Sequence, residues 1–280
     1  MKHARLLGPV AEYLMDHEII PDNVRKFEIF NLGTRDNQDV IVFRCSETGV
    51  IFLNRIDRPN DPYQGRLSRV ESSQTKDNLR RFKFLYDAVK GRNYVDVGCG
   101  AGGLLSLVST IAENAIGVIP GVTSYDIIPG IYQLSEDYCH VASLIHVIEH
   151  MDDPIFHLRE LKPKLKDRGL VFIEVPHAND FLLHNCDKFR EFSLWSEHLI
   201  LHTEGSLRKI IELAGYRVCF IKGLQRYPIS NHMHWMIKGK PGGHEIENIF
   251  NVRRLNECYV RALKADNSTD TLFALAMKED

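Results

Sequence analysis

The strongest constraint on the fold is a short strand-like run that leads directly into a cluster of glycines. The segment reads Val95-Asp96-Val97-Gly98-Cys99-Gly100-Ala101-Gly102-Gly103, and it is called the glycine segment below. Glycine has no Cβ, so such a cluster lets the backbone turn tightly and lets a ligand approach it closely. In open α/β sheets, ligands bind at the carboxyl ends of the strands. The segment therefore predicts a ligand site at the end of the first strand of an α/β sheet.

Strand-like and helix-like segments alternate from residue 93 onward, which is typical of a parallel sheet covered on both faces. The expected helices lie at 72–90, 102–111, 154–165 and 203–213, and the expected strands at 94–97, 115–119, 141–147, 169–175, 216–221 and 271–277. We expect the last two strands to pair antiparallel at the edge of the sheet. The sequence thus predicts a Rossmann-like, doubly wound α/β fold with a mostly parallel sheet and an antiparallel edge strand.

The first 70 residues differ from the rest of the chain. Two short apolar runs, 40–43 and 49–53, flank a turn-prone stretch and predict a β-hairpin. Arg58-Pro59-Asn60-Asp61-Pro62 then interrupts the pattern. We therefore expect a small β-rich appendage over 1–70 and the main α/β domain over 71–280.

Charge and cysteine content exclude several classes of protein. Lys and Arg number 35 against 37 Asp and Glu, so there is no electrostatic footprint for a nucleic-acid partner. No apolar stretch is long enough to span a membrane, and the N-terminus lacks the pattern of a signal peptide. The six cysteines include no CxxC pair. We therefore expect neither disulfides nor a metal, and a cytoplasmic location.

The spacing of the glycines leaves two ligand classes open. Gly98, Gly100 and Gly103 fit the GxGxxG pattern of dinucleotide sites. Asp96, two positions before the first glycine, separates the two classes, because a carboxylate sits badly beside a pyrophosphate and well beside a cationic ligand. S-adenosylmethionine carries both an ammonium and a sulfonium, so Asp96 favours it. A tight turn without any ligand is the third interpretation.

The glycine segment resembles the first motif of the class I S-adenosylmethionine-dependent methyltransferases. By that resemblance, Asp96 holds the methionine end of the cofactor. The resemblance also implies that Gly98, Cys99, Gly100 and Gly102 line the path of the cofactor. S-adenosylmethionine is therefore the expected cofactor.

One position departs from that family. Ile119 stands at the end of the second strand, where the family places a carboxylate that accepts hydrogen bonds from the ribose hydroxyls. Isoleucine has no acceptor, and the interval 120–140 is short for the usual helix and strand. We expect Asp126 to be the residue that could replace the missing carboxylate, with Ile119 lining the cofactor site.

A second polar segment, His146-Val147-Ile148-Glu149-His150, follows the expected strand 141–147. Its side chains fall at the carboxyl end of a strand, where chemistry could take place. Glu149 and His150 could orient one another as an acid/base pair, or could form a structural hydrogen bond. The segment resembles the HVLEH-type segment of the methyltransferase branch that includes ubiquinone-biosynthesis and sugar methyltransferases. That resemblance implies that His146 lines the cofactor pocket near the transferred methyl, and we include His150 among the catalytic candidates.

A third segment, Trp195-Ser196-Glu197-His198, precedes the expected helix 203–213. It is similar to the EH segment of sugar C-methyltransferases, in which that pair faces the substrate. Histidine is well suited to remove a proton near neutral pH, so we expect His198 to be the catalytic base, assisted by Glu197. Trp195 stands near the place of the usual tyrosine and cannot ionise, which weakens the case for C-methylation. The competing interpretation is that His198 only packs its loop.

Two further segments carry weaker signals. Residues 226–244 are expected to form a loop-like insertion whose aromatic, amide and basic side chains suit a carbohydrate or phosphorylated acceptor, as in methyltransferases of bacterial surface-polysaccharide pathways. Cys45 and Thr48 lie in a stretch similar to a zinc-ribbon knuckle in which Thr48 replaces the second cysteine. A single thiol does not hold zinc, so we expect a metal-free hairpin there.

Three functions follow from these patterns. The first is methyl transfer from S-adenosylmethionine to a small polar acceptor, such as a sugar or nucleotide-sugar. The second is a catalytically silent methyltransferase-like binding protein, motivated by Ile119. The third is an NAD(P)-dependent dehydrogenase or epimerase, against which Asp96 counts.

Overall fold

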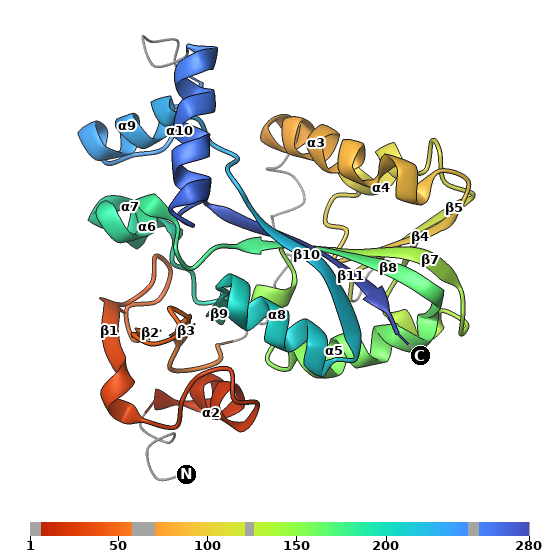
Figure 1. The fold of residues 1–280 in the computed structure, drawn as a ribbon, viewed down its shortest axis with the longest axis horizontal. Helices are drawn as coiled ribbons and strands as arrows, with labels where there is room; N and C mark the ends of the chain where they lie inside the picture. The colour runs from red at the N-terminus through yellow and green to blue at the C-terminus, as the bar shows by residue number, and fades with distance from the viewer. Residues whose placement is uncertain (1–6, 58–70, 121–125, 246–251, 280) are drawn as a thin grey trace.

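A seven-stranded sheet forms the centre of the computed structural model, which describes residues 7–57, 71–120, 126–245 and 252–279. Its strand order is β10-β11-β8-β7-β4-β5-β6 (Figure 1). The strands are β4 (Asn93–Val97), β5 (Asn114–Val118), β6 (Ile127–Ile128), β7 (Cys139–Ile145), β8 (Leu165–Pro176), β10 (Tyr216–Leu224) and β11 (Thr271–Lys278).

Most neighbours in this sheet are parallel, as the alternation of strands and helices predicts. β4 pairs in parallel with β5 and β7, and β7 pairs in parallel with β8. β11 runs antiparallel to both β8 and β10, and it lies between them, one position in from the edge. The predicted Rossmann-like fold and the antiparallel pair of late strands are therefore confirmed.

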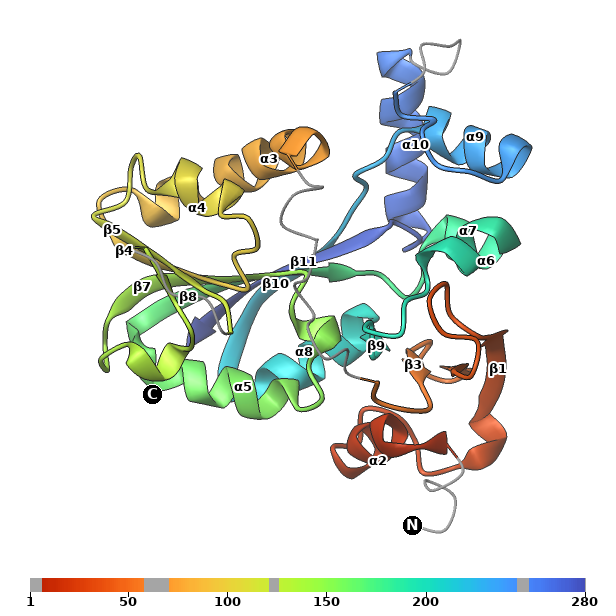
Figure 2. The same cartoon turned by 180° about the vertical axis from the view of Figure 1, so that it is seen from behind.

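Helices cover both faces of the sheet (Figures 1 and 2). α3 and α4 lie on one face, and α5 and α8 on the other. The bounds are α3 (Glu71–Val89), α4 (Gly103–Val108), α5 (Pro154–Leu161) and α8 (Glu204–Leu213). Local sequence signals set these starts: Asp153 caps α5 by accepting from the Phe156 N–H, and Thr203 forms a capping box with Ser206 at α8.

The N-terminal part forms a second sheet, of order β1-β2-β3-β9, in which all neighbours are antiparallel. The predicted hairpin is present as β2 and β3. β9 comes from the main domain and directly follows residues 195–199, called the His198 segment below. The N-terminal appendage therefore shares a sheet with a strand of the main domain. The predicted linker 58–62 and the boundary at residue 70 lie outside the described residues. The elements are α2 (Pro9–Asp16), β1 (Phe27–Leu32), β2 (Ile41–Cys45), β3 (Ile51–Leu53) and β9 (Ile200–Leu201).

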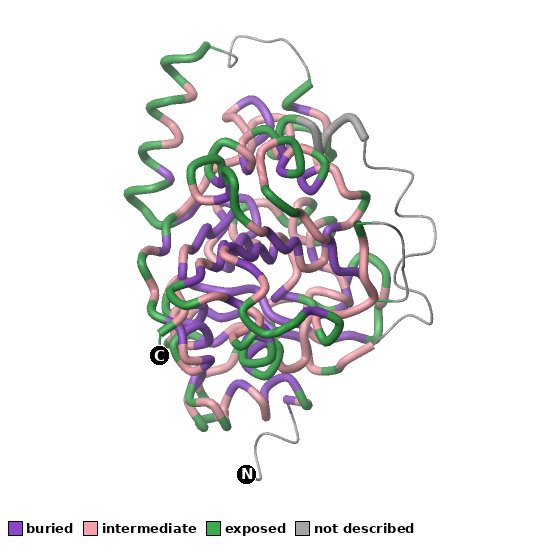
Figure 3. The backbone as a smooth tube through the Cα atoms, turned by 90° about the vertical axis from the view of Figure 1, so that its right-hand side faces the viewer, coloured by how far each residue is buried: buried purple, intermediate pink, exposed green. Residues whose placement is uncertain are grey.

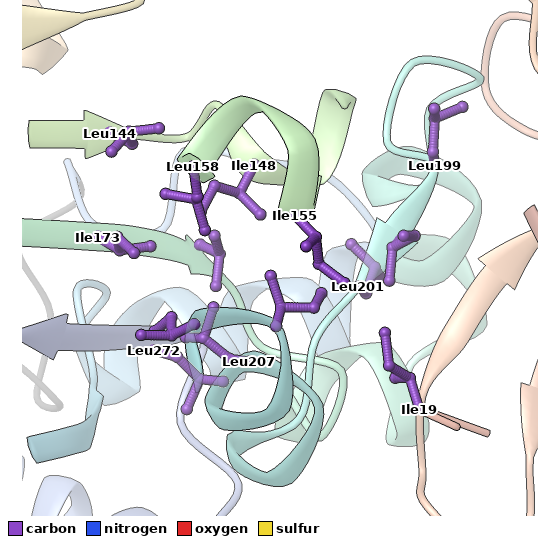
Figure 4. Close-up of a cluster of buried hydrophobic side chains, with 14 of the residues drawn as sticks. Ile19, Leu144, Ile148, Ile155, Leu158, Ile173, Leu199, Leu201, Leu207 and Leu272 are labelled. Carbon is purple, nitrogen blue, oxygen red and sulfur yellow. The ribbon is translucent and has the colours of Figure 1, made fainter. Parts of the chain in front are cut away.

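One hydrophobic core joins the two sheets. Ile19 and Phe52 of the N-terminal part belong to the same buried cluster as Ile148 and Leu201 of the main domain. Figure 4 shows part of this cluster, with Ile148, Leu199 and Leu201 of the main domain in the same view as the N-terminal Ile19. In Figure 3 the buried segments gather in the interior of the body. The core therefore fixes the position of the His198 segment.

The segment 226–244, expected to be a loop, is largely helical, so that expectation was wrong. α9 spans Ile229–Lys238 and ends at Gly239, whose φ of 62° is left-handed. Its buried side includes Ser230, Asn231 and His232, so the helix lacks the apolar period that reveals most helices in a sequence. The remaining elements are α6 (Phe181–Asn185), α7 (Asp187–Ser193), α10 (Arg253–Ala265), and the 3-10 turns η1 (Val24–Lys26), η2 (Ile131–Gln133), η3 (Ile148–His150) and η4 (Lys162–Lys164).

None of the helices in the described part of the chain is both long and apolar enough to cross a membrane.

Candidate active site

The glycine segment forms a tight turn between β4 and α4. Gly98, Gly100 and Gly102 have φ of 74°, 53° and 76°, which is the left-handed region that only glycine adopts readily. A Cβ at Gly98 would overlap the side chain of Val147, whereas a Cβ at Gly100 or Gly102 would meet no atom within 4 Å. The backbone at Gly100 and Gly102 therefore borders open space, as a cofactor-binding turn requires.

Asp96 lies beneath this turn and is only 2% exposed. Its carboxylate accepts a hydrogen bond of 2.7 Å from the Ser143 hydroxyl, which in turn lies 2.6 Å from the Tyr94 hydroxyl. Burial raises the pKa of Asp96 to about 6, although the Ser143 hydrogen bond and the charge of Arg81 act in the opposite direction. Asp96 is thus a carboxylate that changes charge near the physiological range.

Two predicted cofactor residues point their side chains into the protein. Cys99 is 8% exposed, and its Sγ lies against Gly117 of β5. Ile119 is 1% exposed, and its N–H donates to the carbonyl of Ile128 in β6. Asp126 precedes β6, and its main-chain carbonyl accepts a hydrogen bond from the N–H of Gly117, the next-to-last residue of β5. Any contact of Cys99 or Ile119 with a cofactor would therefore come from the backbone.

His146 directly follows β7 and is held between two buried carboxylates. Its Nδ1 lies 3.1 Å from Glu149 Oε1, and its Nε2 lies 3.3 Å from Glu174 Oε1. Burial alone would lower the pKa of His146, but the two carboxylates raise it. Its φ of 54° is unusual for a residue with a side chain, and such strain costs about 1–3 kcal/mol and gathers at functional sites.

Glu174 connects this histidine to helix α3. Arg81 Nη2 lies 2.7 Å from Glu174 Oε1, and Arg80 Nη2 lies 3.0 Å from Oε2. Burial would raise the pKa of Glu174, but His146 and Arg81 hold it well below its usual range. Arg226, from the link between β10 and α9, brings its Nη1 to 3.3 Å from His146 Nε2. Glu174, Arg80 and Arg81 were not predicted as site residues, whereas Arg226 belongs to the segment 226–244 that was expected to suit an acceptor. A glutamate inside the apolar strand 170–175 was a usable signal.

Glu149, His150 and His198 come together beside His146. One metal-ligand atom from each lies within 4.8 Å of the other two. The rings of His150 and His198 are 4.8 Å apart, edge to face. Glu149 is completely buried, and the hydrogen bond from His146 and the nearby histidine charges lower its pKa to about 2 against the effect of burial. We call Glu149, His150 and His198 the EHH cluster below.

Contacts from the N-terminal sheet hold the His198 segment in place. Asp36 accepts hydrogen bonds from the Ser196 N–H at 2.9 Å and from its hydroxyl at 2.6 Å. The guanidinium of Arg35 lies 3.9 Å from the centre of the Trp195 ring. On the other side, the Leu199 N–H donates to the Glu149 carbonyl. The appendage thus positions one of the three residues of the EHH cluster.

Of the predicted catalytic residues, His150 and His198 meet through their side chains, whereas Glu197 contacts His150 through its main-chain carbonyl. His150 and His198 are neighbours, as described. Glu197 contributes its carbonyl, which lies 2.9 Å from His150 Nδ1. Two clefts lie elsewhere, of about 460 Å³ beside α7 and α9 and about 430 Å³ beside α8, and none of the predicted catalytic or cofactor residues lines either of them.

A family model described as a methyltransferase domain matches residues 69–219. That match spans the glycine segment, His146 and the EHH cluster, and it covers more than half of the chain. The chain therefore belongs to the methyltransferase-domain family, and it is a class I S-adenosylmethionine-dependent methyltransferase by fold and sequence. S-adenosylmethionine is its cofactor.

Solved structures share the fold. An S-adenosylmethionine-dependent methyltransferase from Archaeoglobus fulgidus is similar with a TM-score of 0.50 and 18% identity, over 73% of this chain and 94% of that one. A Haloferax volcanii complex that contains the Trm112 methyltransferase activator is similar with a TM-score of 0.52 and 14% identity, over 80% and 100%. No curated protein sequence matches the chain.

Proposed function

We propose that this chain transfers the methyl group of S-adenosylmethionine to a small polar acceptor held against His146 and the EHH cluster. The proposal depends on the contact between the glycine turn, where the cofactor would bind, and the segment that carries the histidines. Gly98 lies directly against Val147, the residue that follows His146. A cofactor on the glycine turn would therefore present its reactive end close to the histidines.

The residues present fit the cofactor. Open space borders Gly100 and Gly102, and a carboxylate lies beneath them in Asp96. Bound S-adenosylmethionine supplies an electrophilic methyl group on a sulfonium sulfur. The turn would hold the methionine portion, and Asp96 would favour its positive charge. Ile119 leaves the ribose without the usual acidic partner, so we expect backbone atoms to hold the ribose.

The acceptor must lose a proton when its oxygen, nitrogen or carbon takes the methyl group. We place that step at His198, which is half-buried and next to His150. The His150 Nδ1–H donates to the Glu197 carbonyl, which fixes the orientation of the His150 ring. Glu197 would thus assist through the main chain.

Arg226 supports a hydroxyl-bearing or phosphorylated acceptor, such as a sugar or nucleotide-sugar. Its guanidinium is paired with Asp270 at 3.4 Å and approaches His146. Guanidinium groups offer several donors in one plane, which suits hydroxyl and phosphate oxygens. We therefore expect the acceptor to bind between Arg226 and the EHH cluster.

Two glycine variants test the cofactor site. Gly100→Ala and Gly91→Ala both add a methyl group at a left-handed position, with φ of 53° and 66°, and in both cases the new Cβ meets no atom within 4 Å. Both should therefore cost the fold a similar 1–2 kcal/mol or so. Only the methyl group at Gly100 enters the expected cofactor space. Calorimetry with S-adenosylmethionine should show at least a tenfold or so weaker affinity for Gly100→Ala, about 1.4 kcal/mol, and unchanged affinity for Gly91→Ala.

Release of the demethylated cofactor tests turnover. We expect it when nucleotide-sugars are supplied together with S-adenosylmethionine. Equal cofactor binding by the two glycine variants, or no cofactor binding at millimolar concentration by the unaltered chain, would instead favour a silent binding protein.

A further inference from the structure

The EHH cluster assembles ligand atoms from two distant segments of the chain. Glu149 and His150 end the turn after β7, and His198 lies just before β9. The hydrogen bond of 2.8 Å from the Leu199 N–H to the Glu149 carbonyl ties the two segments together. Ile148 and Leu199, the neighbours of the cluster in the sequence, are both anchored in the core. The three side chains are therefore held in place by packing and by main-chain bonds.

The Glu149 carboxylate has an unused oxygen. Oε1 lies 3.1 Å from His146 Nδ1, whereas Oε2 is buried and has no hydrogen-bond partner among the residues that the structure describes. A buried charged acceptor left unsatisfied costs more than the 1–3 kcal/mol or so of a neutral one. A cation held beside this oxygen would supply the missing interaction.

The two histidines are arranged as metal ligands usually are. His150 Nδ1 is 2.9 Å from the Glu197 carbonyl oxygen. It therefore carries the proton, and Nε2 is left with a lone pair. Metal-bound histidines commonly donate their second nitrogen to a carbonyl or carboxylate in this way. The ring of His198 stands 4.8 Å from that of His150, so both rings border the same small space.

We propose that Glu149, His150 and His198 bind a divalent first-row transition-metal ion such as Zn²⁺, Mn²⁺, Fe²⁺ or Co²⁺. Two imidazoles and one carboxylate suit these ions, whereas Ca²⁺ and Mg²⁺ prefer oxygen ligands. Ligands about 2.1 Å from an ion lie at most about 4.2 Å apart. The cluster, at 4.8 Å, would contract slightly, and a small rotation of the exposed His150 side chain would be enough. Three protein ligands leave coordination positions for water or an acceptor.

The proposal assigns a ligand set without cysteine, which is why the spacing of the cysteines did not predict it. It rests on the proposed function only for the consequence of binding. A hydroxyl coordinated to such an ion has a lowered pKa, so the acceptor would lose its proton to solvent before its oxygen takes the methyl group. His198 would then hold the ion, and the ion would promote the proton loss that we otherwise assign to His198 as a base.

Co²⁺ is a suitable probe, because its visible absorption reports coordination by nitrogen and oxygen. We would treat the 280-residue chain with a chelator, titrate it with CoCl₂, and follow absorption together with calorimetry. The unaltered chain should bind one Co²⁺. His150→Ala and His198→Ala should each weaken binding by at least tenfold or so. His157→Ala removes an exposed histidine of α5 and should change nothing. His150 and His198 are not fully buried, so their alanine variants should fold. The test therefore needs no variant of Glu149, which is completely buried.

The outcomes separate the metal site from the proposed function. The metal site would be overturned if the unaltered chain bound no Co²⁺, or if His150→Ala and His198→Ala bound Co²⁺ as tightly as the unaltered chain does. The same samples are titrated with S-adenosylmethionine. Failure to bind S-adenosylmethionine with intact Co²⁺ binding would remove the proposed function and leave the metal site standing. Cofactor binding and turnover without Co²⁺ binding would leave His198 as the base and remove the ion.

Discussion

The affinity for S-adenosylmethionine should rise between pH 5 and pH 7, because Asp96 must ionise to attract the cationic cofactor. Burial raises the pKa of Asp96 to about 6. About a tenth of the molecules then carry the carboxylate at pH 5, and about nine tenths carry it at pH 7. If only the ionised form attracts the cofactor, the dissociation constant falls about tenfold over this range, or by about 1.4 kcal/mol.

Calorimetric titration at several pH values measures this slope, and Asp96→Asn is the matched variant. The amide can still accept the Ser143 hydrogen bond, but it does not ionise. Its affinity should be low and nearly independent of pH. The range stops at pH 7 because the amino group of the cofactor begins to lose its proton near pH 8. A flat profile for the unaltered chain, or the same slope in Asp96→Asn, would refute this role of Asp96.

Without cofactor, the free energy of unfolding should fall as the pH rises, over the range in which the cofactor affinity increases. The folded pKa of Asp96 lies above that of a free aspartate, so the folded state binds the proton more tightly than the unfolded chain does. Stability is therefore lost as the pH rises from about 4 to 6, by about 3 kcal/mol for a shift of about two pH units. Asp96→Asn should lack this loss. Urea unfolding at pH 4.5 and pH 7 checks the sign.

Three further variants test how the site is held. His198→Ala should lower turnover about 100-fold and leave the affinity for S-adenosylmethionine unchanged in calorimetry; unchanged turnover would remove His198 from the chemistry. Asp36→Ala removes both hydrogen bonds to Ser196, so it should lower the free energy of unfolding by about 1 kcal/mol and lower turnover. Asp39 is exposed on the same loop, and Asp39→Ala should behave like the unaltered chain. Equal turnover in the two variants would argue against positioning by the N-terminal sheet. Glu174→Gln leaves Arg80 and Arg81 without their buried partner and should cost about 3–5 kcal/mol in chemical denaturation, and a loss below 1 kcal/mol or so would show that the arginines find other partners.

The parts of the fold that could be predicted are those with local signals. The β-branched run before Gly98 and the cap at Thr203 depend on neighbours in the sequence, and both are present. β9 has only two residues, and it pairs with β3 about 150 positions earlier in the chain. No local pattern indicates such a pairing. α9 was missed because Ser230, Asn231 and His232 are polar and only Trp235 on its buried side is apolar.

The same distinction holds for the site. The glycine segment and the histidines were visible because glycine clusters and histidine pairs are rare. Their partners were not, because Arg80 and Arg81 look like the solvent-facing side of an amphipathic helix until the fold brings Glu174 against them. The link between His198 and Glu149 also depends on the core, through Ile148 and Leu199. Chemistry-bearing residues were thus easier to predict than the contacts that orient them.

A crystal structure with S-adenosylhomocysteine, the demethylated cofactor, tests the central claim most directly. The account predicts density for the amino-acid portion over Gly100 and Gly102, above the Asp96 carboxylate, with the sulfur directed toward His146. Density elsewhere, or a glycine turn without ligand at saturating concentration, would contradict it.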